Sequence, residues 1–265
     1  MTARSAWFGV LAALALFCTV WTIGCPAAAA CAQAGSHREI WTSLMTAMAL
    51  LLTAPLIAVW LRAAWLLATA HNELRRLTHI ELPERLHAAV SRTGAVRVAC
   101  VVGSAPEALC VGVMHPRILV TSRIVEGLRD RELDAVLLHE QHHATRRDPL
   151  RRAILRAAAD VYFFVPVLHW WAQRQLAQSE LEADRVAIGR LGRGAVAGAL
   201  WRVGTATGPK GAAAFSGAAE LRVAQVLGDP IRKDSIPLRL WASSGAGWLL
   251  VFSFAWCLSH LVAGL

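Results

Sequence analysis

Residues 130–143, DRELDAVLLHEQHH, have the clearest helical pattern in the central part of the chain, and the rest of its fold can be worked out around them. Three acidic residues stand at its start, where the dipole of a helix favours negative charge: Asp130, Glu132 and Asp134. Leu133, Val136 and Leu137 then recur at helical spacing, which gives the helix one apolar face. The stretch therefore predicts an amphipathic helix from Asp130.

The end of this helix carries the strongest chemical signal in the sequence, a His-Glu-x-x-His motif. His139 and His143 are four residues apart and share a helix face, so both rings can point a nitrogen at one Zn²⁺ ion. Glu140 lies about 100° around the helix from His139, where it can act as a base on water without taking a ligand position. The alternative is a solvated polar helix face.

A third ligand is needed, and the sequence offers it on a later helix. The metzincin pattern would place glycine and histidine at positions 146 and 149, but Arg146 and Pro149 stand there. In the sequence SELEAD, Glu180 and Asp184 share a helix face. We expect Glu180 to be the third ligand, as in gluzincin-type sites, and Asp184 to orient a ligating histidine. Here too the alternative is a solvated helix face.

The regions around these motifs predict an α+β fold that is mainly α. Runs rich in β-branched residues and bounded by glycine or proline predict strands at 96–102 and 117–121, hence a small sheet. Helical patterns follow at about 150–162 and 169–188. Residues 189–217 contain eight glycines among alanines, which predicts a mobile flap or a linker.

The composition argues against a wholly soluble protein, because 56% of the residues are hydrophobic and only 17% are charged. Long uncharged stretches with tryptophans predict transmembrane helices at 7–30, 41–61 and 241–265. They would flank a zinc metallopeptidase domain at 71–239. Buried core helices are the alternative for all three stretches, and a cleaved signal peptide is the alternative for the first.

The basic residues set the expected orientation in the membrane. Arginines and lysines cluster on the inner sides of the second and third predicted spans: Arg62, Arg75, Arg76, Arg222, Arg232, Lys233 and Arg239. They predict a multi-pass protein of the cell membrane with its central domain in the cytoplasm. The net charge of +9 would also suit nucleic acid, but no recognition motif accompanies it, so nucleic acid is not expected as a partner. A further group is expected to bind acidic substrate segments or lipid headgroups: Arg146, Arg147, Arg151, Arg152 and Arg156.

Residues 96–188 resemble a known family. The resemblance is carried by residues 133–143, by the Arg146-Arg147-Asp148 turn and by residues 180–184, with Ala105-Pro106, Gly112, Pro116, residues 118–120 and residues 166–171 in support. This pattern is similar to the integral-membrane metallopeptidases of the β-lactam-sensor antirepressor type (BlaR/MecR-like), distant relatives of the CAAX prenyl protease and the heat-shock membrane protease. The resemblance implies a zinc endopeptidase on the cytoplasmic membrane face. It also implies His139, His143 and Glu180 as ligands and Glu140 as the base.

Two departures qualify the resemblance. Ala183 stands where the family usually has cysteine, and the sequence has no Ser-x-x-Lys acylation motif, so direct β-lactam sensing is not expected. A separate sensor protein is an expected partner instead.

The expected function is cleavage of a cytoplasmic or membrane-proximal protein, with a transcriptional repressor as the candidate that the resemblance implies. His142 and His169 are extra candidates for stabilising the developing oxyanion, and Asp148 is expected to be a turn residue. One alternative is a catalytically silent membrane signalling scaffold with a structural metal site. Another is a quality-control or lipoprotein-processing peptidase.

Overall fold

A computed structural model describes residues 37–263, apart from 104, 106, 207 and 232–234. The chain divides into two compact units, of which one contains residues 59–161 and 168–235, and the other contains the ends of the chain together with residues 162–167. The elements are α2 (His37–Arg75), β1 (His79–Ile80), α3 (Glu84–Thr93), β2 (Val98–Val101), β3 (Ala108–Val111), β4 (Arg117–Thr121), α4 (Ser122–Gly127), α5 (Asp130–Arg146), α6 (Asp148–Val161), α7 (Pro166–Leu191), α8 (Arg193–Ala206), α9 (Gly208–Leu227) and α10 (Leu238–Ala263). The predicted α+β class with mainly α content is confirmed.

The sheet is small and mixed, with the strand order β1-β2-β4-β3. Strands β2 and β4 pair in parallel, with Cys100 opposite Val120, and the outer strands pair antiparallel to them. These two inner strands are the predicted ones, and their buried side chains are Cys100 and Val101 of β2 and Ile118, Leu119 and Val120 of β4. Strands β1 and β3 are additional to the prediction, because two and four residues are too short for a periodic signal.

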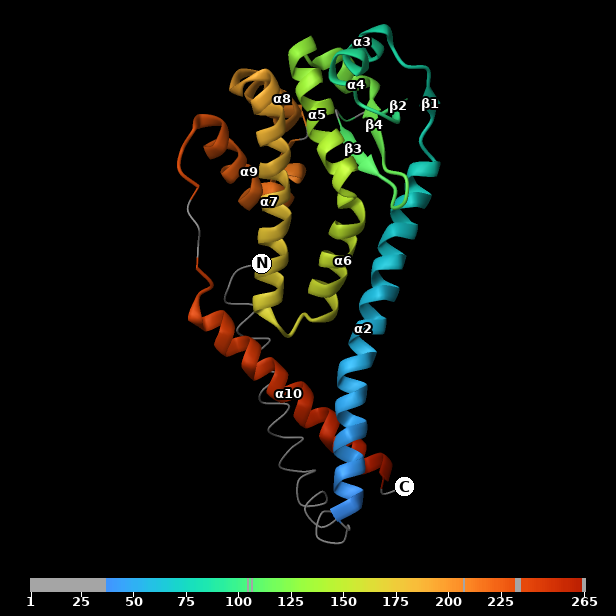
Figure 1. Cartoon of the computed structure of the whole chain (residues 1–265), viewed down its shortest axis with the longest axis vertical. Helices are drawn as coiled ribbons and strands as arrows, with labels where there is room; N and C mark the ends of the chain where they lie inside the picture. Colours follow the sequence, from blue (N-terminus) through green and yellow to red (C-terminus); the bar gives the residue numbers. More distant parts are fainter. Residues whose placement is uncertain (1–36, 104, 106, 207, 232–234, 264–265) are drawn as a thin grey trace. The chain divides into compact units, whose positions relative to one another are not determined.

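Helix α5 lies at the centre of this unit, with the sheet and α3 on one side and α8 on another (Figure 1). Its Leu133 and Leu137 are fully buried against Ile118 and Val120 of β4 and Leu86 of α3. Burial of each such side chain stabilises the fold by about 1.5–3 kcal/mol. The apolar face read from the sequence therefore fixes how α5 packs, and so where its polar end points.

The ends of α5 are fixed by local contacts. The backbone N–H of Arg129 donates to the Glu132 carboxylate at 2.8 Å, which holds the first turn. At the other end Arg147 adopts a left-handed conformation, with φ 54°, and the chain turns directly into α6. This tight turn brings the first residue of α6, Asp148, back toward the end of α5.

The predicted flap or linker at 189–217 is wrong, because the chain there forms the end of α7, α8 and the start of α9. Alanine is the best helix former, and it offsets the cost of the glycines. Val196 of α8 is buried in a cluster with Ala135 and Leu138 of α5 and Ala187 of α7. Tertiary packing thus makes a helix of a segment whose composition indicates a loop.

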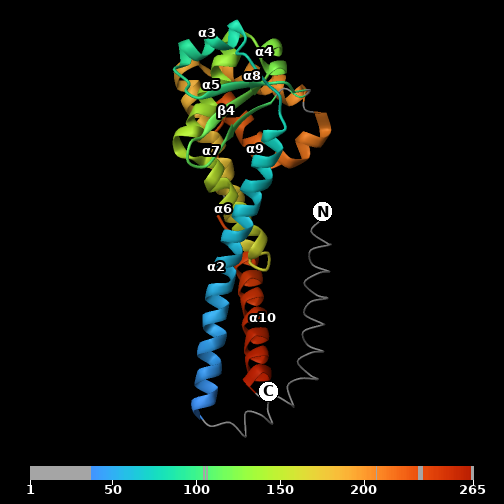
Figure 2. The ribbon, with the colours of Figure 1, turned by 90° about the vertical axis from the view of Figure 1, so that its right-hand side faces the viewer.

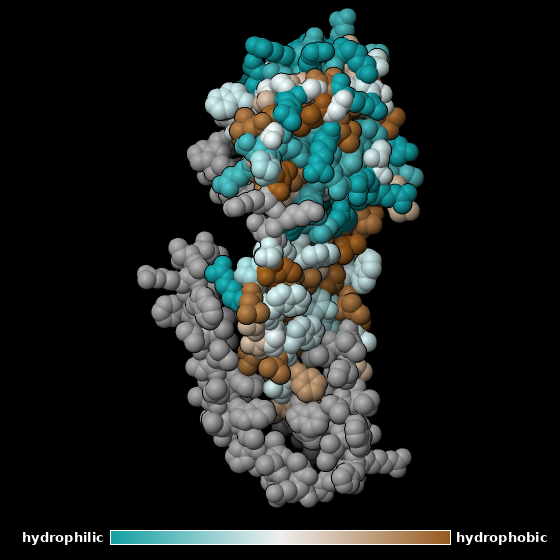
Figure 3. Space-filling view, turned by 60° about the vertical axis from the view of Figure 1, so that its left-hand side comes forward, coloured by the Kyte–Doolittle hydropathy of each residue, from teal (hydrophilic) through white to brown (hydrophobic). Residues whose placement is uncertain are grey.

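Helices α2 and α10 contain two of the predicted membrane spans, and Figure 2 shows each as a long continuous helix. Helix α2 continues past the predicted end at Leu61 to Arg75. Among the described residues, the segment Thr53–Arg75 is long and apolar enough to cross a membrane, and its Trp60 and Trp65 are exposed. Teal side chains cover much of the unit that contains α5 (Figure 3). The predicted span at 7–30 lies outside the described residues.

Candidate metal centre

Helices α5 and α7 bring three of the predicted site residues together. His139 and His143 project from one face of α5, with their Nε2 atoms 3.1 Å apart. Glu180 of α7 places its carboxylate oxygens 3.3 Å from Nε2 of His139 and 3.7 Å from Nε2 of His143. One ligand atom from each residue lies within 4.8 Å of the others, as a group that holds a single metal ion requires.

The outer nitrogens of the two histidines are held by buried carboxylates. Asp184 Oδ1 lies 2.8 Å from Nδ1 of His139, and Asp148 Oδ2 lies 2.6 Å from Nδ1 of His143. A carboxylate can only accept, so each Nδ1 donates, and a neutral imidazole then carries at Nε2 the lone pair that a metal ion binds. The two Nε2 atoms lie 3.1 Å apart, so both can bind the same ion. The donor set therefore fits a metal ion bound by nitrogen and carboxylate ligands.

Asp148 directly follows the turn at Arg147, as expected of a turn residue, and its carboxylate in addition contacts a candidate ligand, which the sequence interpretation did not anticipate. Its side chain is 1% exposed, and it accepts a hydrogen bond from Ser179 of α7 at 2.6 Å as well as the one from His143. Burial alone would raise the pKa of Asp148, but these two hydrogen bonds outweigh it and lower the pKa to about 2. Two signals could have found it: its place two residues after the end of α5, and its position in the Arg146-Arg147-Asp148 turn that carries part of the family resemblance.

Two arginines also belong to this centre. Arg152 of α6 contacts the Glu180 carboxylate, and its Nη2 lies 3.2 Å from Nε2 of His143. Arg222 of α9 forms an ion pair with Asp184 at 2.7 Å and lies 3.4 Å from Glu180. The sequence interpretation had assigned Arg152 to a basic group expected to bind acidic substrate segments or lipid headgroups, and had used Arg222 only as an orientation signal. Nothing local in the sequence distinguishes either one from its neighbouring arginines.

The charges of the centre suit a divalent cation. Four carboxylates, those of Glu140, Asp148, Glu180 and Asp184, face two guanidiniums, which leaves two negative charges to be compensated by a proton on a histidine or by a bound cation. Burial alone would lower the pKa of His139, but its hydrogen bonds to Asp184 and Glu180 raise that pKa to about 9. Burial would raise the pKa of Glu180, but His139 and the two guanidiniums lower it well below its usual range. The centre thus attracts positive charge.

Glu140 follows His139 on α5 and is not a member of the His139, His143 and Glu180 group. It is half-buried on α5, next to His139 but around the helix from the ligand face. Burial raises its pKa, and the nearby charges of His139 and His143 act in the opposite direction. A carboxylate with a raised pKa is a better proton acceptor than an exposed one.

The two other histidine candidates differ in position. Nε2 of His142 is buried without a hydrogen-bond partner among the described residues, and its ring centroid lies 6.1 Å from that of His143. His169 is exposed on α7, eleven residues before Glu180, which is about three helical turns away. The structure therefore places His142 beside the centre and His169 away from it.

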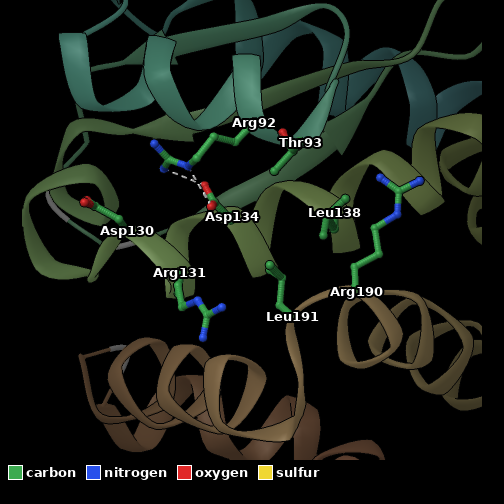
Figure 4. Close-up of a pocket in the computed structure, with 8 residues that line it drawn as sticks. All are labelled: Arg92, Thr93, Asp130, Arg131, Asp134, Leu138, Arg190 and Leu191. Atoms are coloured by element: carbon green, nitrogen blue, oxygen red, sulfur yellow. Dashed lines mark hydrogen bonds and ion pairs between the residues drawn. The ribbon is translucent and has the colours of Figure 1, made fainter.

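A separate pocket of about 610 Å³ lies between α3, α5 and α7 and contains none of these site residues. Figure 4 shows that the guanidinium of Arg92 turns to Asp134, to which it is hydrogen bonded, while Arg131 and Arg190 extend in other directions. The pocket has no converging set of functional groups, so the metal centre remains the candidate site.

Comparison with known proteins agrees with this geometry. No curated protein matches the chain. A family model described as BlaR1 peptidase M56 matches residues 13–197, which include the His-Glu-x-x-His motif, Glu180 and Asp184. The match covers well over half of the sequence, and the resemblance drawn from the motifs is thereby confirmed. The chain belongs to the BlaR1 peptidase M56 family of metallopeptidases.

Proposed function

We propose that this protein is a membrane-embedded, zinc-dependent endopeptidase that hydrolyses peptide bonds of a cytoplasmic or membrane-proximal protein. One observation carries the proposal. The Nε2 lone pairs of His139 and His143 and the carboxylate of Glu180 converge on one point, while buried carboxylates hold both Nδ1 atoms. Nitrogen and carboxylate ligands with such outer partners are typical of zinc sites.

In this proposal His139, His143 and Glu180 hold Zn²⁺, and Asp148 and Asp184 keep the two imidazoles oriented. Zn²⁺ bound there would supply a Lewis acid that polarises the scissile carbonyl. Glu140 takes a proton from the attacking water and returns it to the leaving amine, which suits a half-buried carboxylate of raised pKa. With three protein ligands, a bound Zn²⁺ would retain access to water or substrate, as a catalytic site requires and a purely structural site does not.

The lipid bilayer is a proposed partner because of the exposed apolar segment Thr53–Arg75. The basic residues at its cytoplasmic end favour an orientation with the metal centre in the cytoplasm. The substrate is then a protein on that side, and a transcriptional repressor is the candidate that the family resemblance indicates. A separate sensor protein would supply the inducing signal.

The test is zinc content together with proteolysis of a casein-type substrate, measured on the detergent-purified full chain. We expect the wild type to bind about one zinc and to cleave. Glu140→Ala should retain zinc but lose activity, and Glu180→Ala should lose both. Glu182→Gln is the matched control on α7, because Glu182 pairs with Arg146 instead of the ligands. A wild type that binds no zinc would contradict the proposal. Zinc binding with unchanged cleavage in Glu140→Ala would remove Glu140 from the mechanism.

A further inference from the structure

Arg222 contacts both carboxylates that α7 contributes to the metal centre. Its Nε and Nη2 atoms donate to the two oxygens of Asp184 at 2.7 and 2.8 Å, and its Nη1 lies 3.4 Å from Glu180 Oε2. The Arg222 side chain is only 17% exposed, and Asp184 is almost completely buried. This is the two-pronged geometry in which a guanidinium fixes the plane of a carboxylate as well as neutralising it.

The contact places Arg222 one step from the ligands. Asp184 accepts from Nδ1 of His139 at 2.8 Å with the same Oδ1 atom that accepts from Nη2 of Arg222. Arg222 therefore fixes the carboxylate that orients one ligand, and it directly approaches the carboxylate of another. Without it, Asp184 and Glu180 would lie one helical turn apart with a buried negative charge uncompensated, and they would repel each other.

We propose that Arg222 is a positioning residue for the metal centre, which sets the orientation of Glu180 and Asp184 and so raises the metal affinity of the site. The inference rests on the proposed function only in taking these residues to hold a metal. It adds a requirement that the α5–α7 motifs do not contain, because Arg222 lies on α9, beyond the residues 13–197 that the family model matches. The metal centre is complete only when α9 is docked.

A merely structural role would be that Arg222 fastens α9 to α7. A variant of Gln225 can distinguish helix docking from orientation of the carboxylates. Gln225 lies three residues further along α9, and its Nε2 donates to the backbone carbonyl of Leu181 at 3.0 Å. Gln225 thus also links α9 to α7, but it touches neither Glu180 nor Asp184. Loss of Gln225 reports on docking alone, whereas loss of Arg222 reports on docking and carboxylate orientation together.

The experiment compares four full-length proteins in detergent: wild type, Arg222→Met, Arg222→Lys and Gln225→Ala. Zinc affinity is measured by competition with a chelator, and the visible absorption of the Co²⁺-loaded proteins reports on the ligand geometry. We expect Arg222→Met to lower zinc affinity on the order of 10- to 100-fold and to alter the Co²⁺ spectrum. The zinc affinity of Arg222→Lys should lie between those of the wild type and Arg222→Met, because an ammonium group keeps the charge but cannot donate to both carboxylate oxygens at once. Gln225→Ala should retain the wild-type affinity and spectrum.

The outcomes are distinguishable. Equal losses in Arg222→Met and Gln225→Ala, or wild-type affinity in Arg222→Met, would overturn the inference. If Arg222→Met does not fold by circular dichroism, Arg222→Lys decides: wild-type affinity and spectrum there would also overturn it. A wild type without zinc would instead contradict the proposed function, so the two failures cannot be confused.

Discussion

The helix pair α5 and α7 contrasts with the helix pair α8 and α9. In α5 and α7 the residues of each motif are four positions apart, so they lie on one helix face, and that face points into the site. In α8 and α9 the glycine-rich sequence has the composition of a linker, yet both segments are helical, and α9 supplies a buried arginine to the site. The comparison teaches that local periodicity reveals what a helix presents, but not which distant side chain completes a site.

The first prediction compares a buried core residue of each helix pair, because truncating such residues should reduce stability most. Leu137→Ala in α5 removes a fully buried side chain and should lower the free energy of unfolding by about 2–5 kcal/mol. Val196→Ala in α8 should lower it by about 1.5 kcal/mol, because two buried methylene equivalents are lost. Urea unfolding in detergent, followed by circular dichroism, measures both. An unchanged free energy of unfolding in Val196→Ala would mean that α8 does not pack on α5. The segment would then behave as the linker that its composition indicates.

A second prediction compares local and distant support of the metal centre. Asp148→Asn keeps the shape of the side chain but removes the charge beside His143 Nδ1, and it should lower zinc affinity about 10- to 100-fold. The same loss of zinc affinity is expected for Arg222→Met on α9, although Asp148 is close in sequence to the histidine it contacts and Arg222 is distant from the ligands. Chelator competition is the measurement, and Glu182→Gln is the control that should retain wild-type affinity. Unchanged affinity in Asp148→Asn would show that His143 is oriented by other contacts.

The smallest effect concerns two glycines of α8. A Cβ added at Gly198 would lie 3.0 Å from Cδ of Glu132, which is held by the Arg129 N–H and by Arg202. Gly198→Ala should therefore disturb the first turn of α5 and lower stability by about 1 kcal/mol. Gly194 faces open space, so Gly194→Ala should raise stability by up to about 1 kcal/mol through helix propensity.

Thermal unfolding of the two variants under identical conditions tests this difference. Equal shifts in the same direction would show that α8 does not approach Glu132 closely. Such a result would weaken the role of α8 as a packed helix and leave the description of α5 and α7 intact.

Much of the site was predictable because it rests on short-range geometry. A four-residue spacing puts His139 and His143 on one face whatever the rest of the fold does, and the same spacing pairs Glu180 with Asp184. Asp148 escaped prediction because its role depends on the left-handed turn at Arg147. Arg152 escaped because several neighbouring arginines have the same sequence context, and only the packing of α6 selects one of them.

The helices that carry the candidate ligands, the inner strands of the sheet and the family could all be read from the amino-acid sequence. The physical reason is that helical and strand periodicities act over a few residues and need no knowledge of distant contacts. The helices at 193–206 and 208–227, and the contact of Arg222 with Asp184 and Glu180, follow from tertiary packing instead. Burial of Val196 outweighs the glycine cost there, and the pairing of buried charges selects one arginine among many, which are effects that only the folded chain creates.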